Sequence, residues 1–199
     1  MTPIIKGIVA SGISGHLVGP YSPTGSYDAL AVYTVPSGGA SSITFAGIPQ
    51  SGYQHLQIRC LINTTSGIGG STCFTINGDT ASNYTNHELT GYYNNGSAGY
   101  GGFSYTTSSG RNYCQSLIIN GFSAPLAIIW DILDYTNSTK YKTIKCLYGT
   151  DNNGSNSNEI GLSSSLWLNT NTINSLTFTN TNGYSFPQYS QIALYGIRG

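Results

Sequence analysis

The segment that decides the fold class is His55-Leu56-Gln57-Ile58-Arg59-Cys60-Leu61-Ile62-Asn63. Its apolar side chains alternate along the chain, so an extended strand places Leu56, Ile58, Cys60 and Ile62 on one face. The other face then carries His55, Gln57, Arg59 and Leu61. A turn-forming stretch follows at 66–70 and a β-rich segment at 71–77, so we predict a β-hairpin formed by 55–63 and 71–77.

Strand signals of the same kind recur along the chain from residue 27 onward. They cover residues 27–35, 41–46, 84–93, 112–120, 125–135, 141–148, 159–168, 173–179 and 191–197. Residues typical of turns, mostly Gly, Asn, Ser and Pro, lie between these segments. Short strands at this spacing predict a single all-β domain over 27–199, an antiparallel β-sandwich of jelly-roll type.

The composition supports this fold class and excludes several functions. Gly, Ser, Thr and Asn make up 92 of the 199 residues, whereas Glu occurs twice and Lys four times, which argues against exposed helices. Charged residues are 7% of the chain and the net charge is zero, so the clustered cations of a nucleic-acid-binding protein are missing. No apolar run reaches the roughly 20 residues of a membrane span. A polar but nearly uncharged surface favours a protein that functions in an assembly.

The first 26 residues differ from the rest of the chain. They contain many Gly and Pro residues and show no sustained hydrophobic period, which predicts an extended N-terminal arm over 1–26. The arm nevertheless carries apolar side chains that a solvated linker would not need. We therefore expect it to contact a partner protein through Ile4, Ile5, Ile8, Val9, Ile13 and Leu17.

A Tyr- and Gly-rich stretch is the best candidate for a binding surface. Residues 94–110 are predicted to form an exposed loop. Tyr provides contact area at low entropic cost, and Ser and Asn provide adaptable hydrogen bonds. The candidate residues for binding a glycan or another subunit are Tyr92, Tyr93, Tyr100, Phe103 and Tyr105. An ordinary loop packed by its own aromatic side chains is the alternative.

The sequence offers no recognisable catalytic, cofactor or metal site. Asp131 and Asp134 are three apart in one predicted strand, so they point to opposite faces and cannot form the carboxylate pair of a glycosidase. The simpler interpretation is cross-strand ion pairs with Lys140, Lys142 and Lys145. The three His residues are far apart, and the chain has neither a nucleophile elbow nor a phosphate-binding loop. We therefore expect a protein that is not an enzyme.

The four cysteines lack the spacing of a zinc site. Each lies in a predicted strand, so we predict reduced thiols in the core at Cys60, Cys73, Cys114 and Cys146. A disulfide between Cys60 and Cys73 across the predicted hairpin stays open as an alternative. Trp130 and Trp167 also lie in apolar strands and are predicted to be core residues.

Several blocks of the chain resemble a family of structural proteins of tailed-phage virions. The blocks are 41–50, 53–59, 77–84, 131–143, 166–169, 173–176 and 189–199. They include Asn77-Gly78-Asp79 and the run Asp131-Ile132-Leu133-Asp134-Tyr135. The resemblance covers roughly 27–199 and leaves out the arm and the segment 94–110.

This resemblance implies a non-enzymatic β-sandwich component of a phage particle, without cofactor. The first hypothesis is a capsid decoration (cement) protein in the virion, whose arm lies on the major capsid protein and whose sandwich forms a homotrimer. The alternative is a tail-fibre or appendage module that binds a host-surface glycan through the Tyr-rich segment. Neither hypothesis involves nucleic acid or a membrane.

Overall fold

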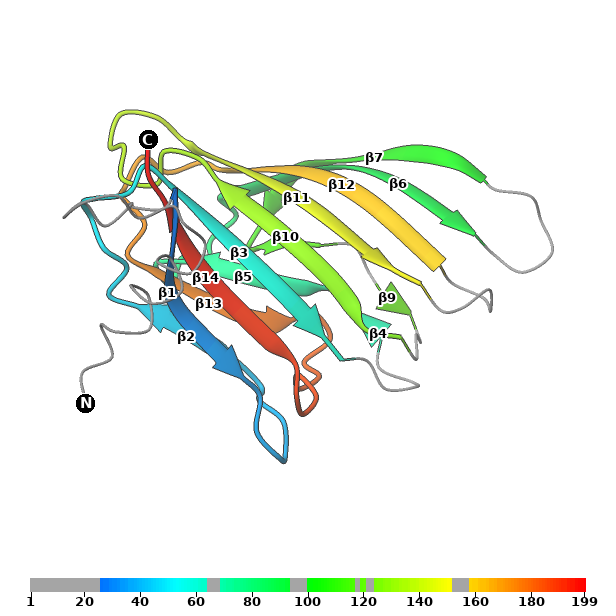
Figure 1. Cartoon of the computed structure of the whole chain (residues 1–199). Coiled ribbons are helices and arrows are strands. Elements are labelled where there is room, and N and C mark those ends of the chain that lie inside the picture. Colours follow the sequence, from blue (N-terminus) through cyan, green and yellow to red (C-terminus); the bar gives the residue numbers. More distant parts are fainter. Residues whose placement is uncertain (1–25, 64–68, 94–99, 117–118, 121–123, 152–157) are drawn as a thin grey trace, which may run out of the picture.

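The structure is a computed structural model that describes residues 26–63, 69–93, 100–116, 119–120, 124–151 and 158–199. Every regular element in these ranges is a β-strand (Figure 1). The largest sheet has eight strands in the order β1-β14-β3-β10-β11-β12-β6-β7, all antiparallel. Its strands are β1 (Tyr27–Thr34), β14 (Gln191–Ile197), β3 (His55–Ile62), β10 (Leu126–Ile132), β11 (Lys142–Thr150), β12 (Asn158–Trp167), β6 (Tyr84–Tyr93) and β7 (Tyr100–Arg111).

A four-stranded sheet lies against one face of this large sheet (Figure 1). Its order is β2 (Ile43–Ala46), β13 (Ser175–Asn180), β5 (Thr72–Ile76) and β8 (Cys114–Gln115). A short ladder joins β4 (Gly69–Gly70) to β9 (Ile119–Asn120). The antiparallel β-sandwich is thereby confirmed, whereas the jelly-roll topology stays a prediction.

The core lies between the two sheets and is aromatic at its centre. Trp130 of β10 packs edge-on against Phe74 of β5, with ring centroids 5.3 Å apart, and also contacts Phe178 of β13. Trp130 and Trp167 are both about 1% exposed, as predicted. All four cysteines are buried free thiols, which agrees with the predicted core positions. Cys60 and Cys73 lie in different sheets, so the alternative of a disulfide across a hairpin has no support.

The alternation that predicted β3 is confirmed for the apolar face, whereas Gln57 on the other face is also buried, at 8% exposed. Leu56 and Ile58 are fully buried, and Cys60 and Ile62 are nearly so, whereas Arg59 and Leu61 are exposed. The β10–β11 hairpin is also confirmed, with Asp131 opposite Lys145 in the ladder. The remaining predicted strands agree with the observed bounds to within a few residues, except in the three cases that follow.

The predicted hairpin of 55–63 with 71–77 is wrong. β3 pairs with β14 and β10 in the large sheet, whereas β5 pairs with β13 and β8 in the small sheet. Both strands bury one apolar face in the same core, and they do so from opposite sides. The chain between them therefore crosses from one sheet to the other instead of closing a tight turn.

The predicted loop over 94–110 is wrong for residues 100–110. Residues 100–111 form β7, a twelve-residue edge strand paired with β6. The Tyr, Phe and Thr residues of this segment have high β-propensity, and pairing with β6 satisfies the backbone groups on one side of the strand despite the many glycines. Residues 94–99 lie outside the described part of the chain. The predicted strand 112–120 is also wrong as one unit, because β8 and β9 belong to different sheets.

Candidate functional site: the outer face of the large sheet

The outer face of the large sheet, the one turned away from the small sheet, carries a row of exposed aliphatic side chains. Ile129, Leu147, Leu162 and Leu89 are successive cross-strand partners on β10, β11, β12 and β6. They are 36%, 45%, 54% and 52% exposed. Leu61 and Ile160 lie one row further along the strands and are 49% and 63% exposed. We call this surface the apolar band: Leu61, Leu89, Ile129, Leu147, Ile160 and Leu162.

The apolar band breaks the usual pattern of an antiparallel sheet with one solvated face. Strands β10 and β11 already bury Ile128, Trp130, Ile144 and Cys146 on the inner side. The outward positions between them would ordinarily be polar. Apolar residues on both faces are typical of strands that are covered on both sides. A contiguous exposed patch of this kind indicates an interaction surface.

A polar row runs beside the apolar band, one step along each strand. Its members in cross-strand order are Gln57, Asp131, Lys145, Ser164 and His87. The Gln57 side-chain amide donates to Asp131 Oδ1 at 2.8 Å, and Arg59 Nε donates to Gln57 Oε1 at 2.7 Å. The Arg59 guanidinium also lies over the ring of Tyr195, 4.9 Å from its centroid.

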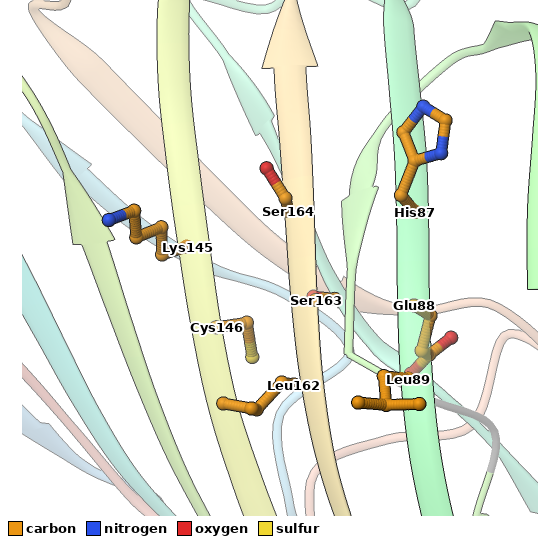
Figure 2. A pocket seen from close by; sticks show the side chains of 8 residues that line it. All are labelled: His87, Glu88, Leu89, Lys145, Cys146, Leu162, Ser163 and Ser164. Carbon is orange, nitrogen blue, oxygen red and sulfur yellow. The ribbon is translucent and has the colours of Figure 1, made fainter. Parts of the chain in front are cut away.

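A shallow hollow of about 390 Å³ opens where the polar row meets the apolar band. Figure 2 shows that Lys145 and His87 flank the short side chain of Ser164, with Leu162 and Leu89 lower down. The small serine between two long side chains creates the depression. Its lining of aliphatic carbon with a cation and an imidazole at the rim suits the side chains of a protein partner.

Behind this region, on the inner face, two glutamates meet one tyrosine. The Tyr148 hydroxyl donates to Glu88 Oε1 at 2.6 Å and lies 3.5 Å from Glu159 Oε1. Burial, together with the negative charge of Glu88, raises the pKa of Glu159 to about 7. Burial likewise raises the pKa of Glu88. The sequence contains only these two glutamates, at inward positions of β6 and β12, a signal that our comparison of carboxylate pairs overlooked.

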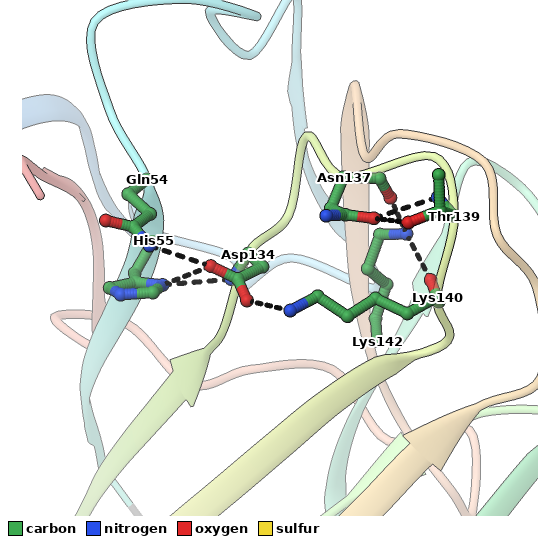
Figure 3. Close-up of polar contacts among 7 residues, drawn as sticks. All are labelled: Gln54, His55, Asp134, Asn137, Thr139, Lys140 and Lys142. Carbon is green, nitrogen blue, oxygen red and sulfur yellow. Dashed lines mark hydrogen bonds and ion pairs between the residues drawn. The ribbon is translucent and has the colours of Figure 1, made fainter.

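The predicted Asp–Lys contacts of the β10–β11 hairpin are confirmed in one case. Asp134 accepts an ion pair from Lys140 and a hydrogen bond from Gln54, and its backbone N–H donates to His55 Nδ1 (Figure 3). Asp134 lies in the turn after β10 with φ 47°, not in the strand as predicted. Among the described ion pairs, none joins Asp131 to Lys145.

The expected ion pair of Lys142 is wrong. Its side chain is fully buried, and its ammonium donates to the carbonyl oxygens of Asn137, Lys140 and Thr170 (Figure 3 draws the first two). Lys142 lies at an inward position of β11, and the turn folds its carbonyls over the ammonium. Lys142 therefore holds the turn of the β10–β11 hairpin together from inside, and it does not form a surface ion pair.

The residues that the sequence singled out for binding lie largely beyond what the structure describes. The candidate arm contacts, Ile4, Ile5, Ile8, Val9, Ile13 and Leu17, fall outside the described residues. Tyr92 and Tyr93 lie at the end of β6, and Tyr100, Phe103 and Tyr105 lie on β7, with Tyr92 opposite Tyr100; their side chains are outside the description. The apolar band was not predicted.

The described residues contain no group of three or more His, Cys, Asp and Glu side chains that could hold a metal ion. Within the same part of the chain there is no helix of the length and hydropathy that a membrane crossing requires. Comparison with protein-family models, with curated proteins and with solved structures gave no match.

Proposed function

We propose that this protein is a non-enzymatic structural component of a phage virion, a decoration protein that binds and stabilises the assembled capsid shell. The observation that carries the proposal is the apolar band on the outer face of the large sheet. Six exposed aliphatic side chains are unfavourable on a protein that works alone, and favourable on one that is covered in an assembly. The resemblance of the sequence blocks to virion structural proteins suggests that this assembly is a phage particle.

A single contact through the apolar band is weak, and repetition of the contact in an array strengthens it. The six side chains are each about half exposed, so covering them contributes roughly 1 kcal/mol apiece. Association costs about 4–15 kcal/mol in lost freedom and ordering. One such contact is therefore weak by itself, and several contacts made by the same chain reinforce one another. A protein that binds only the assembled shell then stabilises that shell by mass action.

The second contact in this proposal is the N-terminal segment. Its apolar side chains would attach the sandwich to the major capsid protein, and the apolar band would contact the neighbouring molecule on the shell. The division of roles is testable because the arm can be shortened without touching any residue of the described sandwich.

Deletion of residues 2–25 is expected to abolish attachment to purified particles while the sandwich stays folded. A full-length companion with Ile4→Ser, Ile5→Ser and Ile8→Ser keeps the length and removes apolar side chains, and it should bind more weakly than the unmodified chain. Co-sedimentation with particles measures occupancy, and circular dichroism of the free proteins verifies the fold. Unchanged occupancy of the truncated protein would contradict the proposal.

The number of copies per particle tests the position in the virion. A decoration protein is present in hundreds of copies, in proportion to the capsid protein, as measured by quantitative mass spectrometry of purified particles. A dozen copies or fewer would overturn the shell assignment and favour the tail-fibre or appendage alternative.

A further inference from the structure

We propose that the apolar band is covered by the same face of a second copy of this chain, about a two-fold axis that runs along the strands between β10 and β11. This goes beyond the proposed function, because a free protein in solution can form the pair without any particle.

The charges next to the axis are complementary under two-fold rotation. Asp131 and Lys145 are direct cross-strand partners on β10 and β11. An axis between these strands brings Asp131 of each copy opposite Lys145 of the other, which gives two equivalent contacts of opposite charge. Within the chain Lys145 is exposed and has no ion pair with a described residue, and Asp131 accepts a hydrogen bond from Gln57. The Lys145 ammonium and the second carboxylate oxygen of Asp131 are therefore available for a contact between copies.

The apolar side chains match under the same operation. Ile129 and Leu147 are neighbours on β10 and β11, so each lies opposite the other in the second copy. Arg59 on β3 is then opposite Leu162 on β12, where the aliphatic stem of the arginine packs over the leucine. Other titratable groups on this face lie away from the axis: His87 on β6 and Tyr195 on β14 stand at opposite ends of the Asp131–Lys145 row, and His55 stands at the start of β3.

The face is large enough for a specific contact. Five adjacent strands, β3, β10, β11, β12 and β6, carry the apolar band. At about 4.8 Å between strands and about 3.4 Å per residue, seven residues of each cover roughly 600 Å². A standard interface buries about 800 Å² per partner, so a face-to-face pair approaches that size. The chain has zero net charge, so two copies do not repel each other at long range.

Geometry also separates this pair from the homotrimer that we expected from the sequence. A closed trimer joins two different surfaces of each subunit. A single face that carries an acid beside a base at its centre is complementary to itself. The two-fold pair therefore covers the apolar band with the same band of the second copy. A trimer would need a second, different surface to cover it.

The test exchanges the two charges and follows self-association of the full chain by sedimentation equilibrium. Asp131→Lys and Lys145→Asp each place like charges opposite one another at the axis, so each is expected to weaken the dimer at least tenfold. The double variant Asp131→Lys/Lys145→Asp restores opposite charges and should restore dimerisation. The decisive measurement uses an equimolar mixture of the two single variants. Within each variant chain, positions 131 and 145 carry like charges, but a heterodimer places opposite charges against one another across the axis.

Matched controls remove the effect of net charge. Ser37→Lys/Ser138→Lys and Ser37→Asp/Ser138→Asp change the charge by the same amounts at exposed turn positions away from the face. Their mixture should show no heterodimer beyond that of the unmodified protein. Thermal unfolding of every variant separates loss of association from loss of fold.

A second variant tests the apolar contact independently. Leu147→Thr keeps a strand-forming residue and removes apolar surface at the axis, so it should weaken the dimer at least tenfold. Leu168→Thr, at an exposed leucine beyond the end of β12, should leave it unchanged. A monomer at all soluble concentrations, a trimer, or a mixture of single variants that fails to associate would overturn the inference. Loss of capsid binding with an intact dimer would instead count against the proposed function alone.

Discussion

At the scale of single residues, the two glutamates around Tyr148 are placed where a charge is costly. Tyr148 donates its one hydroxyl proton to Glu88, and Glu159 lies at the longer distance of 3.5 Å. Position 161 opposite Tyr148 is a glycine, and a Cβ there would lie 1.9 Å from the Tyr148 hydroxyl oxygen. A side chain at position 161 would therefore collide with the Tyr148 ring, and glycine leaves the space that the tyrosine fills. With its pKa raised to about 7 by burial and by Glu88, the Glu159 carboxyl is neutral below that pH and ionised above it.

This environment predicts how stability depends on pH. The pKa of Glu159 rises from 4.5 in the unfolded chain to about 7 in the fold, so the folded state binds this proton more tightly. The favourable contribution is complete below pH 4.5 and is lost as the pH rises through 7. In the Glu159→Gln variant, the free energy of unfolding should fall less between pH 4.5 and pH 7 than in the unmodified protein. At pH 8 the variant should be the more stable of the two. Urea denaturation at pH 5 and pH 8 measures it; an unchanged slope in the variant would refute the assignment.

At the scale of the element, the β10–β11 hairpin depends on a buried cation. The Lys142 ammonium gathers three carbonyl oxygens from the turn and from the segment after β12. Burial lowers the pKa of Lys142, yet hydrogen bonds to a charged donor are stronger than neutral ones. One side chain thus holds the β10–β11 turn closed and also binds it to the connection between β12 and β13, through Thr170.

Replacement of this lysine should destabilise the fold measurably. Lys142→Met keeps the aliphatic stem and leaves three carbonyls without their donor, so we expect a loss of about 3 kcal/mol. Lys140→Met removes only the exposed ion pair with Asp134, and should cost less than about 1 kcal/mol. Chemical denaturation compares the two variants. Equal losses would show that the ammonium contacts of Lys142 contribute little.

Sequence patterns located the elements well and their pairing poorly. Alternation within one strand depends on local geometry, so the bounds of β3, β10, β11 and β14 could be predicted to within a few residues, and for β3 also the apolar face that is buried. Whether β3 pairs with β5 depends on which sheet each joins, and local signals do not contain that information. The turn at Asn77-Gly78 illustrates the point. Its positive φ values, 54° and 70°, follow from local residue preferences. The hydrogen bond that the Trp167 indole N–H donates to Asp79 joins distant parts of the chain, so local sequence does not predict it.

At the scale of the whole molecule, the fold class was predictable and the candidate site was not. Composition and spacing were enough for an all-β sandwich. The apolar band is invisible in the sequence because Leu61, Leu89, Leu147 and Leu162 come from four separated strands. The alternation of 55–63 already places Leu61 opposite the core face, but only the strand order and register bring it together with the leucines of the other three strands. The proposed arm contacts and Tyr-rich surface still stand as predictions from sequence.

The four thiols offer a test of how the sandwich opens as a whole. Cys60 and Cys146 lie on β3 and β11, strands with a neighbour on both sides in the middle of the large sheet. Cys114 lies on β8, a two-residue strand at the edge of the small sheet. Burial raises the pKa of Cys60 and of Cys114, so neither reacts while it is enclosed.

Alkylation of the native protein should therefore follow the order in which strands detach. Edge elements open with less free energy than central ones, so Cys114 is expected to react first and Cys60 and Cys146 only with global unfolding. Time-resolved labelling with isotopic alkylating reagents, followed by peptide mass spectrometry, gives the rate at each site. Without reductant all four should become labelled in denaturant, because none is paired. Identical native rates at all four cysteines would mean that the two sheets separate in a single cooperative step and that β8 has no independent opening.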